Sequence, residues 1–211
     1  MPLEIHTLVL GPLETNCYVL RDVEEYWVVD PGLGPEPLLQ FLRAAKASPR
    51  RILLTHGHGD HIAGVAAVKA AYPGARLCCP AGDAGLLSDP TGNLSGPFGF
   101  ALTAPEADEL LEPGQTLAMG QAAWGLLDTS GHTPGGMSFY CRQDGVVLTG
   151  DALFAGSIGR IDIPGASAGR LLTNIRRHLL TLPDATRVLP GHGPETTIGQ
   201  ERRNNPFLTG D

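Results

Sequence analysis

Four groups able to bind a metal ion occur together in the segment His56-Gly57-His58-Gly59-Asp60-His61. Imidazole and carboxylate groups are ligands that suit Zn, Fe and Mn. Because four of them exceed what one tetrahedral ion can accept from so short a loop, the segment predicts two ions. Glycines between the ligands let the backbone turn back, so that His56 and His58 can reach one ion while Asp60 and His61 reach its neighbour. A loop of solvated histidines is disfavoured, because an apolar strand precedes the segment and an apolar helix follows it.

Three further segments combine an apolar strand, a glycine-containing turn and a residue able to bind metal. They end at His132, Asp151 and His192. Sites in α/β proteins form just beyond the carboxyl ends of strands, where loops present side chains from a fixed backbone. We therefore expect these three residues to meet the first segment in one cleft.

Short apolar runs separated by Gly and Pro predict the strands that position these residues. The expected strands cover residues 3–10, 17–20, 26–29, 52–55, 76–79, 117–119, 122–127, 138–141, 146–149 and 187–189. Helical spacing of apolar residues predicts helices over 38–45, 62–73, 81–87, 168–182 behind a Ser167 cap, and 198–204. Because strands precede helices in both halves, we expect an α/β fold of two stacked sheets with helices outside. Residues 88–105 are expected to form a long loop of the kind that often borders a site.

Length and composition narrow the class of protein. A chain of 211 residues, 1–211, is expected to form a single domain. Its 22 acidic and 15 basic residues give a formal charge of −7, which disfavours a broad nucleic-acid-binding face. The cysteines show no CxxC spacing, so we expect buried thiols at Cys17, Cys78, Cys79 and Cys141. The absence of a signal-peptide pattern and of a long apolar run predicts a cytoplasmic protein that does not bind membranes.

The motifs resemble those of a known family. They are HxHxDH at 56–61, SGHTPGG at 130–136, TGDALF at 149–154 and PGHGP at 190–194. In this order they resemble the metallo-β-lactamase-fold hydrolases, and most closely the short, single-domain glyoxalase II-like (hydroxyacylglutathione hydrolase-like) branch. The similarity extends from residues 15–18 to residues 205–207. It implies an αββα sandwich of two mixed β-sheets with outer helices.

The resemblance also implies a role for each ligand. It places His56, His58 and His132 on one divalent ion, Asp60, His61 and His192 on the other, and Asp151 between the two. Asp60 is expected to act in catalysis as well. The ions are expected to be Zn and/or Fe, with Mn as a third option. Two such ions polarise a bridging water toward hydroxide and hold a carbonyl oxygen, so the expected reaction is hydrolysis of a small-molecule thioester such as S-lactoylglutathione.

Substrate contacts are less fully specified by the motifs. The resemblance assigns Arg160 to a carboxylate of the thiol, because a guanidinium offers a fork for that group; a surface ion pair is the alternative. Glyoxalase II proper has aromatic residues after this basic residue and after the last metal histidine, where this chain has Ile161-Asp162 and Gly193-Pro194. Only 19 residues follow His192, so we expect the short form without the helical glutathione-binding extension.

Other functions are compatible with the same motifs. A mononuclear iron persulfide dioxygenase would need only His56, His132 and Asp151, so two metals per chain would count against it. Lactonases and phosphodiesterases belong to the same superfamily, and a non-enzymatic metal-binding module is a third class. Phe98 and Phe100 are expected to pack within their loop, rather than line the cleft. No oligomeric state is predicted.

Overall fold

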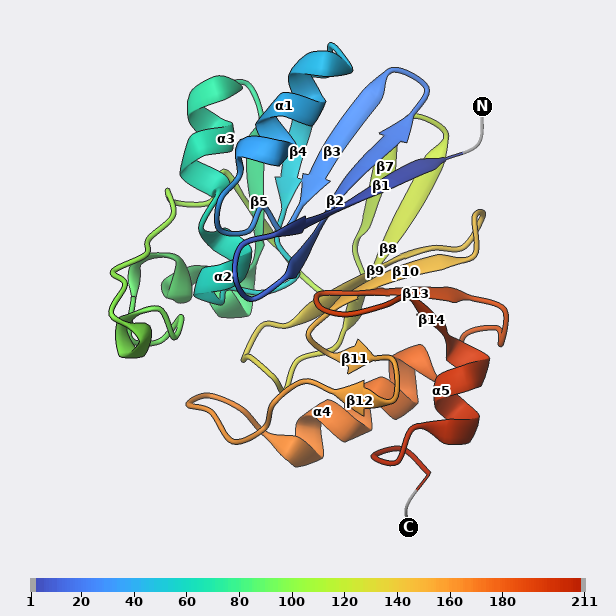
Figure 1. Cartoon of the computed structure of the whole chain (residues 1–211). Helices are drawn as coiled ribbons and strands as arrows, with labels where there is room; N and C mark the ends of the chain where they lie inside the picture. Colours follow the sequence, from blue (N-terminus) through green and yellow to red (C-terminus); the bar gives the residue numbers. More distant parts are fainter. Residues whose placement is uncertain (1–2, 210–211) are drawn as a thin grey trace.

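The computed structural model describes residues 3–209, which form two six-stranded β-sheets stacked face to face (Figure 1). The first sheet has the order β1-β2-β3-β4-β5-β6, with β1 Glu4–Leu10, β2 Thr15–Asp22, β3 Glu25–Val29, β4 Pro49–Leu53, β5 Arg76–Pro80 and β6 Glu109–Leu111. The second has the order β14-β13-β10-β9-β8-β7, with β7 Thr116–Met119, β8 Ala122–Asp128, β9 Met137–Cys141, β10 Val146–Gly150, β13 Arg187–Pro190 and β14 Thr196–Thr197. A small hairpin pairs β11 Leu153–Phe154 with β12 Ser157–Ile158.

Helices cover the outer face of each sheet (Figure 1). They are α1 Glu36–Ala44, α2 Gly59–Ile62, α3 Val65–Ala71, α4 Ala168–Asn174 and α5 Ile198–Asn204, with 3-10 turns η1 Ala81–Ser88 and η2 Gly96–Phe98 and the π-helical turn η3 Ile175–Leu179. One apolar cluster lies between the sheets and includes the fully buried Trp27 and Trp124. Two more lie between the sheets and the outer helices. The predicted αββα sandwich is therefore confirmed.

Both sheets are mixed, as the resemblance implied. β1, β2 and β3 form an antiparallel meander, whereas β3 to β6 are parallel. In the second sheet β10 and β13 are parallel, so their carboxyl ends reach the same edge. The four cysteines are free thiols and all are buried, which confirms the expectation for them.

The structure corrects three predicted helices. Residues 81–88 form the 3-10 helix η1, and the helix expected over 168–182 continues after α4 as the π-helical η3, which ends at Leu179. The helix expected from residue 62 is divided into α2 and α3, which are separated by Ala63 and Gly64; the close packing is at Gly64. Its amide donates to the Pro31 carbonyl oxygen (2.7 Å), and a Cβ at this position would come within 2.7 Å of the Gly32 carbonyl oxygen. The chain therefore breaks there to pack against the loop after β3. The predicted Ser167 cap is confirmed, because its hydroxyl accepts from the Arg170 amide.

Hydrogen bonds join the two sheets at one edge. The Asn16 side-chain amide, on β2, donates to the carbonyl oxygens of Pro190 (3.0 Å) and Gly193 (2.9 Å), and the Tyr18 hydroxyl donates to Pro190 as well (2.7 Å). The Met137 amide, at the start of β9, donates to the carbonyl oxygen of Thr55 (2.9 Å), beyond β4. The loops that follow β4 and β13 are thereby held against each other.

No helix within residues 3–209 has the length and apolar character needed to cross a bilayer.

Replacing Asn16 with Ala is expected to lower the free energy of unfolding by about 1–3 kcal/mol, because the Gly193 carbonyl oxygen loses this side-chain donor and the Pro190 carbonyl oxygen keeps only the Tyr18 hydroxyl. Denaturant unfolding of the purified variant measures the change. Asn204→Ala is the matched control, since Asn204 lies exposed on α5. Equal stability of the two variants would show that the junction does not depend on this amide.

Candidate metal centre

The HxHxDH motif begins three residues after the last residue of β4 and continues into α2. His56 and His58 lie in the loop, and Asp60 and His61 lie on the first turn of the short helix. The glycines serve close packing here, not a left-handed backbone: a Cβ on Gly57 would come within 2.7 Å of the Leu86 Cβ. The prediction that these glycines turn the backbone is therefore refined to a requirement for space.

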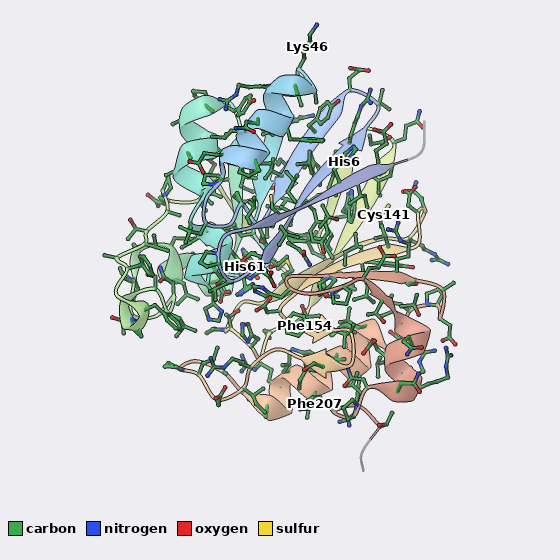
Figure 2. The ribbon with its side chains drawn as sticks, in the orientation of Figure 1. His6, Lys46, His61, Cys141, Phe154 and Phe207 are labelled. Carbon is green, nitrogen blue, oxygen red and sulfur yellow. The ribbon has the colours of Figure 1, made fainter. Side chains whose placement is uncertain are left out.

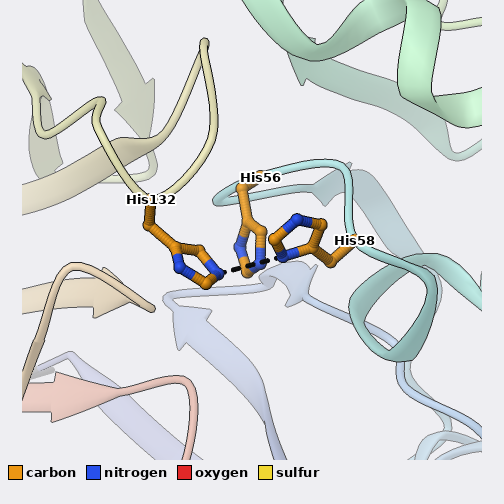
Figure 3. Close-up of side chains that lie close together, drawn as sticks. All are labelled: His56, His58 and His132. Atoms are coloured by element: carbon orange, nitrogen blue, oxygen red, sulfur yellow. Dashed lines mark hydrogen bonds between the residues drawn. The ribbon is translucent and has the colours of Figure 1, made fainter. Parts of the chain in front are cut away.

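The first ligand cluster contains His56, His58 and His132 (Figure 3). The Nδ1 atom of His58 lies 2.9 Å from the Nε2 atom of His132, and the rings of His56 and His58 meet edge to face. One nitrogen from each ring lies within 4.8 Å of the others. All three side chains are buried. The geometry brings together the three residues that sequence analysis assigned to one ion.

The second cluster contains Asp60, His61 and His192. His192 Nε2 lies 3.1 Å from Asp60 Oδ2 and 3.3 Å from His61 Nε2. Asp151 lies between the clusters: its Oδ1 is 3.4 Å from His61 Nε2, and its Oδ2 is 3.6 Å from the Nε2 atoms of both His132 and His192. All seven predicted ligands therefore meet at the edge where the sheets join.

The outward nitrogens of four histidines are fixed by hydrogen bonds. The pairs are His56 Nδ1 with Thr55 Oγ1 (3.0 Å), His61 Nδ1 with Asp30 Oδ2 (3.0 Å), His132 Nδ1 with the Arg160 carbonyl oxygen (2.9 Å) and His192 Nδ1 with the Leu13 carbonyl oxygen (2.9 Å). Such partners orient metal-binding imidazoles and select their tautomer. The Nε2 atom of each ring is thereby directed toward the centre of the site.

Two buried atoms indicate that the residues fit metal ions. His56 Nε2 and Asp151 Oδ1 have no hydrogen-bond partner among the residues that the structure describes. Leaving a buried polar atom without a partner is costly. A cation bound in each cluster would satisfy both atoms, and the imidazole and carboxylate donors suit Zn, Fe or Mn.

Protonation also divides the histidines into two groups. Burial, reinforced by the neighbouring imidazoles, holds the pKa of His56 well below its usual range, and burial with the facing His132 lowers the pKa of His58 to about 3. Burial alone would lower the pKa of His61 too, but the carboxylates of Asp60, Asp151 and Asp30 outweigh it and raise that pKa well above its usual range. His56 and His58 are therefore neutral ligands, whereas His61 carries a proton that a metal must displace.

Sequence analysis missed Asp30 and Asp83. Asp30 accepts from the Thr55 amide (2.8 Å) and hydroxyl (2.6 Å) in addition to its contact with His61. Its only sequence signal is its place between a strand and Pro31-Gly32, a pair that is typical of a turn.

Asp83 is fully buried between the two loops that carry the first cluster. Its carboxylate accepts from the Gly57 amide (3.0 Å), the Thr133 hydroxyl (2.6 Å) and the Gly135 amide (2.6 Å). Gly57 lies between two ligands, and Thr133 follows a third. Asp83 is therefore a positioning residue for the first cluster, and no local motif marks it.

A cleft of about 680 Å³ opens over the clusters. Its lining includes His58, Asp60, His132, Asp151 and His192, and the predicted substrate contact Arg160. Apolar residues from four loops and from β11 complete it, among them Leu13, Leu33, Phe98, Phe100, Phe154 and Ile163. Arg160 is exposed and its guanidinium bonds both oxygens of Asp162 (3.0 and 3.1 Å). The expectation that Phe98 and Phe100 pack within their loop is wrong, because both rings line the cleft and face solvent.

Comparison with known proteins agrees with this geometry. The sequence profile of the Metallo-beta-lactamase superfamily matches residues 10–192, which include all seven ligands. The Bacillus subtilis protein named "Probable metallo-hydrolase YqgX" is 38% identical over 202 residues, covering 95% of each chain. The Haemophilus influenzae protein named "Hydroxyacylglutathione hydrolase GloC" is 32% identical over 213 residues, covering 98% of each.

Two crystal structures share the architecture over nearly the whole chain. The BLEG-1 B3 metallo-β-lactamase superposes with a TM-score of 0.93 at 40% identity, covering 98% of this chain and 100% of its own. TTHA1623, in a di-iron-bound form, superposes with a TM-score of 0.87 at 38% identity, covering 96% of this chain and 100% of its own. The fold is thus one that holds two metal ions in a solved relative.

Metal binding is expected to release protons. Asp60 and Asp151 raise the pKa of His192 against the effect of burial, and with Asp30 they raise the pKa of His61 well above its usual range, so that His61 is protonated in the metal-free protein near neutral pH. Zn²⁺ binding must displace this proton, and Zn²⁺ affinity should therefore fall as the pH is lowered. Calorimetric titration in buffers of different ionisation enthalpy measures the release. A binding enthalpy that is the same in every buffer would contradict this protonation scheme.

Replacing Asp83 with Asn is expected to weaken metal binding in the first cluster by about tenfold or more, because a side-chain amide cannot accept from all three donors. Competition with a chromogenic chelator measures the two affinities. Binding in the second cluster should change little. Glu112→Gln, at an exposed carboxylate, is the control; if Asp83→Asn binds metal as tightly as this control, the positioning role is wrong.

Proposed function

Because the chain belongs to the metallo-β-lactamase superfamily, we propose that this metallo-hydrolase cleaves a thioester of glutathione type such as S-lactoylglutathione. The observation that carries the proposal is the pair of adjacent ligand clusters, with Asp151 between them, at the floor of a cleft. The glutathione thiol is supported by the name of the Haemophilus influenzae relative. The alignment covers 98% of that protein and 98% of this chain, so the two are of nearly the same length.

The proposal assigns the two metals to the two clusters. His56, His58 and His132 would hold one divalent ion and Asp60, His61 and His192 the other, with Asp151 contributing to both. When bound, the ions lower the pKa of a coordinated water and polarise the carbonyl group of the substrate. The donor set suits Zn and Fe, and the di-iron form of TTHA1623 supports Fe as one of them.

The residues of the chain supply orientation and charge. Asp60 lines the cleft, and His61 and His192 lower the pKa of its carboxyl although burial opposes them, so it is ionised. The carboxylate can accept a hydrogen bond from the attacking water and hold it facing the thioester carbon. Thr15 supports this orientation, because its hydroxyl donates to Asp60 Oδ2 (3.3 Å).

Arg160 is proposed to bind a carboxylate of the thiol. Its guanidinium is exposed at the cleft and bonds Asp162 in a two-pronged arrangement. A substrate carboxylate would replace Asp162 in the same fork, since both groups have the same geometry. The short chain segment between Ile158 and Ile163 thus presents the cation and its exchangeable partner together.

A β-lactam is the second candidate substrate. A solved relative at 40% identity is a B3 metallo-β-lactamase. Both reactions add water to a carbonyl group, so the same clusters would serve either one. A mononuclear iron dioxygenase, by contrast, would use His56, His132 and Asp151 and leave the second cluster idle.

Protein reconstituted with Zn²⁺ or Fe²⁺ is expected to hydrolyse S-lactoylglutathione with two metals per chain. Asp60→Ala removes a ligand and the carboxylate that orients water, and should reduce kcat/KM by about a hundredfold or more. Thiol release measured in steady state, with nitrocefin assayed in parallel, tests this. Thioester turnover no greater than that of Asp60→Ala would contradict the thioester proposal. Nitrocefin cleavage without thioester cleavage would favour the β-lactam as substrate.

A further inference from the structure

One wall of the cleft carries exposed aromatic rings. Phe98 and Phe100 are 65% and 53% exposed, whereas the other phenylalanine on a cleft wall, Phe154, is half-buried beside His192. Large apolar groups gathered at a concave surface are typical of a binding site. In the view of Figure 2, Phe154 lies between His61, in the metal-binding segment, and Phe207, near the C-terminus.

A fixed loop, not a loose one, presents the two rings. The buried Asn93 side chain donates to the carbonyl oxygens of Leu86 (3.0 Å) and Leu102 (2.9 Å) and accepts from the Ser95 amide (3.0 Å). The Ser95 carbonyl oxygen in turn accepts from the Phe100 amide (3.0 Å). These bonds close the loop across its base. The hydrogen bonds within the loop therefore fix the backbone that presents the two rings to solvent.

The same loop is joined directly to the metal-binding segment. The Gly59 amide donates to the Asn93 carbonyl oxygen (2.8 Å), and a Cβ on Gly59 would come within 2.9 Å of the Ser95 Cβ. Gly59 lies between His58 and Asp60. The aromatic wall is thus continuous with the ligands, and an occupant of the wall would extend from the metal centre.

The lining of the cleft combines many apolar side chains with a single Lys or Arg side chain among the described residues. Leu13, Leu33, Leu94 and Leu102 line the same cleft as Phe98 and Phe100. Arg160 supplies the one Lys or Arg side chain among the cleft-lining residues within 3–209, and it comes from the loop after β12 in the second half of the chain (Figure 1). A ligand that fits this cleft has an anionic part and a separate, sizeable apolar part.

We propose that this wall binds the acyl group of the substrate and favours a large apolar acyl group, of aliphatic medium-chain type, over the lactoyl group. The assignment rests on the proposed thioester hydrolysis, with the thiol directed to Arg160. The lactoyl group is short and bears a hydroxyl, so it would leave Phe98, Phe100 and the surrounding leucines in water. An acyl chain extending from the metal centre along the wall removes that surface from water.

Binding of non-hydrolysable S-alkylglutathione thioethers to the metal-loaded protein separates the two parts. Affinity measured by calorimetry should rise with alkyl length from methyl to octyl, by up to about fourfold for each methylene that is fully buried. The double variant Phe98→Ser, Phe100→Ser should abolish most of this rise. Arg160→Gln should weaken all thioethers by a similar factor and leave the rise intact. Phe207→Ser, an exposed ring outside the cleft, is the matched control.

Hydrolysis tests the same inference in the reacting substrate. Octanoylglutathione should show a higher kcat/KM than S-lactoylglutathione, and the double variant should lose that preference. Affinity that does not depend on alkyl length, or a rise that persists in the double variant, overturns the inference. A change of particle mass in the double variant with an unchanged rise would instead make the wall an interface between copies. Length-dependent binding without hydrolysis of any thioester would refute the proposed reaction and leave the apolar site standing.

Discussion

Hydrogen bonds between the two sheets at one edge underlie the whole site. Apolar packing between sheets is not directional, so it brings the layers together without fixing how their strand ends meet. Here the backbone amide of Asn16 donates to the Gly191 carbonyl oxygen (2.8 Å), and the Tyr18 hydroxyl donates to the Pro190 carbonyl oxygen. The backbone amide of Met137 donates to the Thr55 carbonyl oxygen. Gly150 has no side chain and a positive φ, which lets β10 approach Thr55 closely. Ligands from both sheets can converge because these contacts set the register between the strand ends.

Charge balance explains how so polar a cluster is buried. Asp30, Asp60 and Asp151 all act on His61, and isolated buried carboxylates would be costly. In the metal-free protein the proton on His61 offsets part of this negative charge. A divalent ion replaces that proton and adds charge where the carboxylates already meet. The residues whose charges balance in the metal-free protein are therefore also those that make cation binding favourable.

The ligands could be predicted from the sequence because each has a local signal. His132, Asp151 and His192 each follow an apolar strand and a glycine, and the other four share one short segment. Asp83 could not be found in this way, because its three partners lie 26, 50 and 52 residues away and only the fold brings them to it. The break at Gly64 was hidden for the same reason, since its cause is the backbone of the loop at Pro31 and Gly32.

The loop over residues 88–105 inverts the usual distribution of side chains. Its Asn93 is fully buried and its Phe98 is 65% exposed, so polar bonds hold the loop together while apolar rings face the cleft. Composition alone suggested the opposite, because phenylalanines in a loop ordinarily supply its packing. The Asn93 side chain donates hydrogen bonds to backbone carbonyl oxygens of the loop and of η1. Its backbone carbonyl oxygen accepts from the Gly59 amide (2.8 Å). The rings are therefore free to serve as a wall, and one backbone hydrogen bond sets how far that wall lies from the ligands.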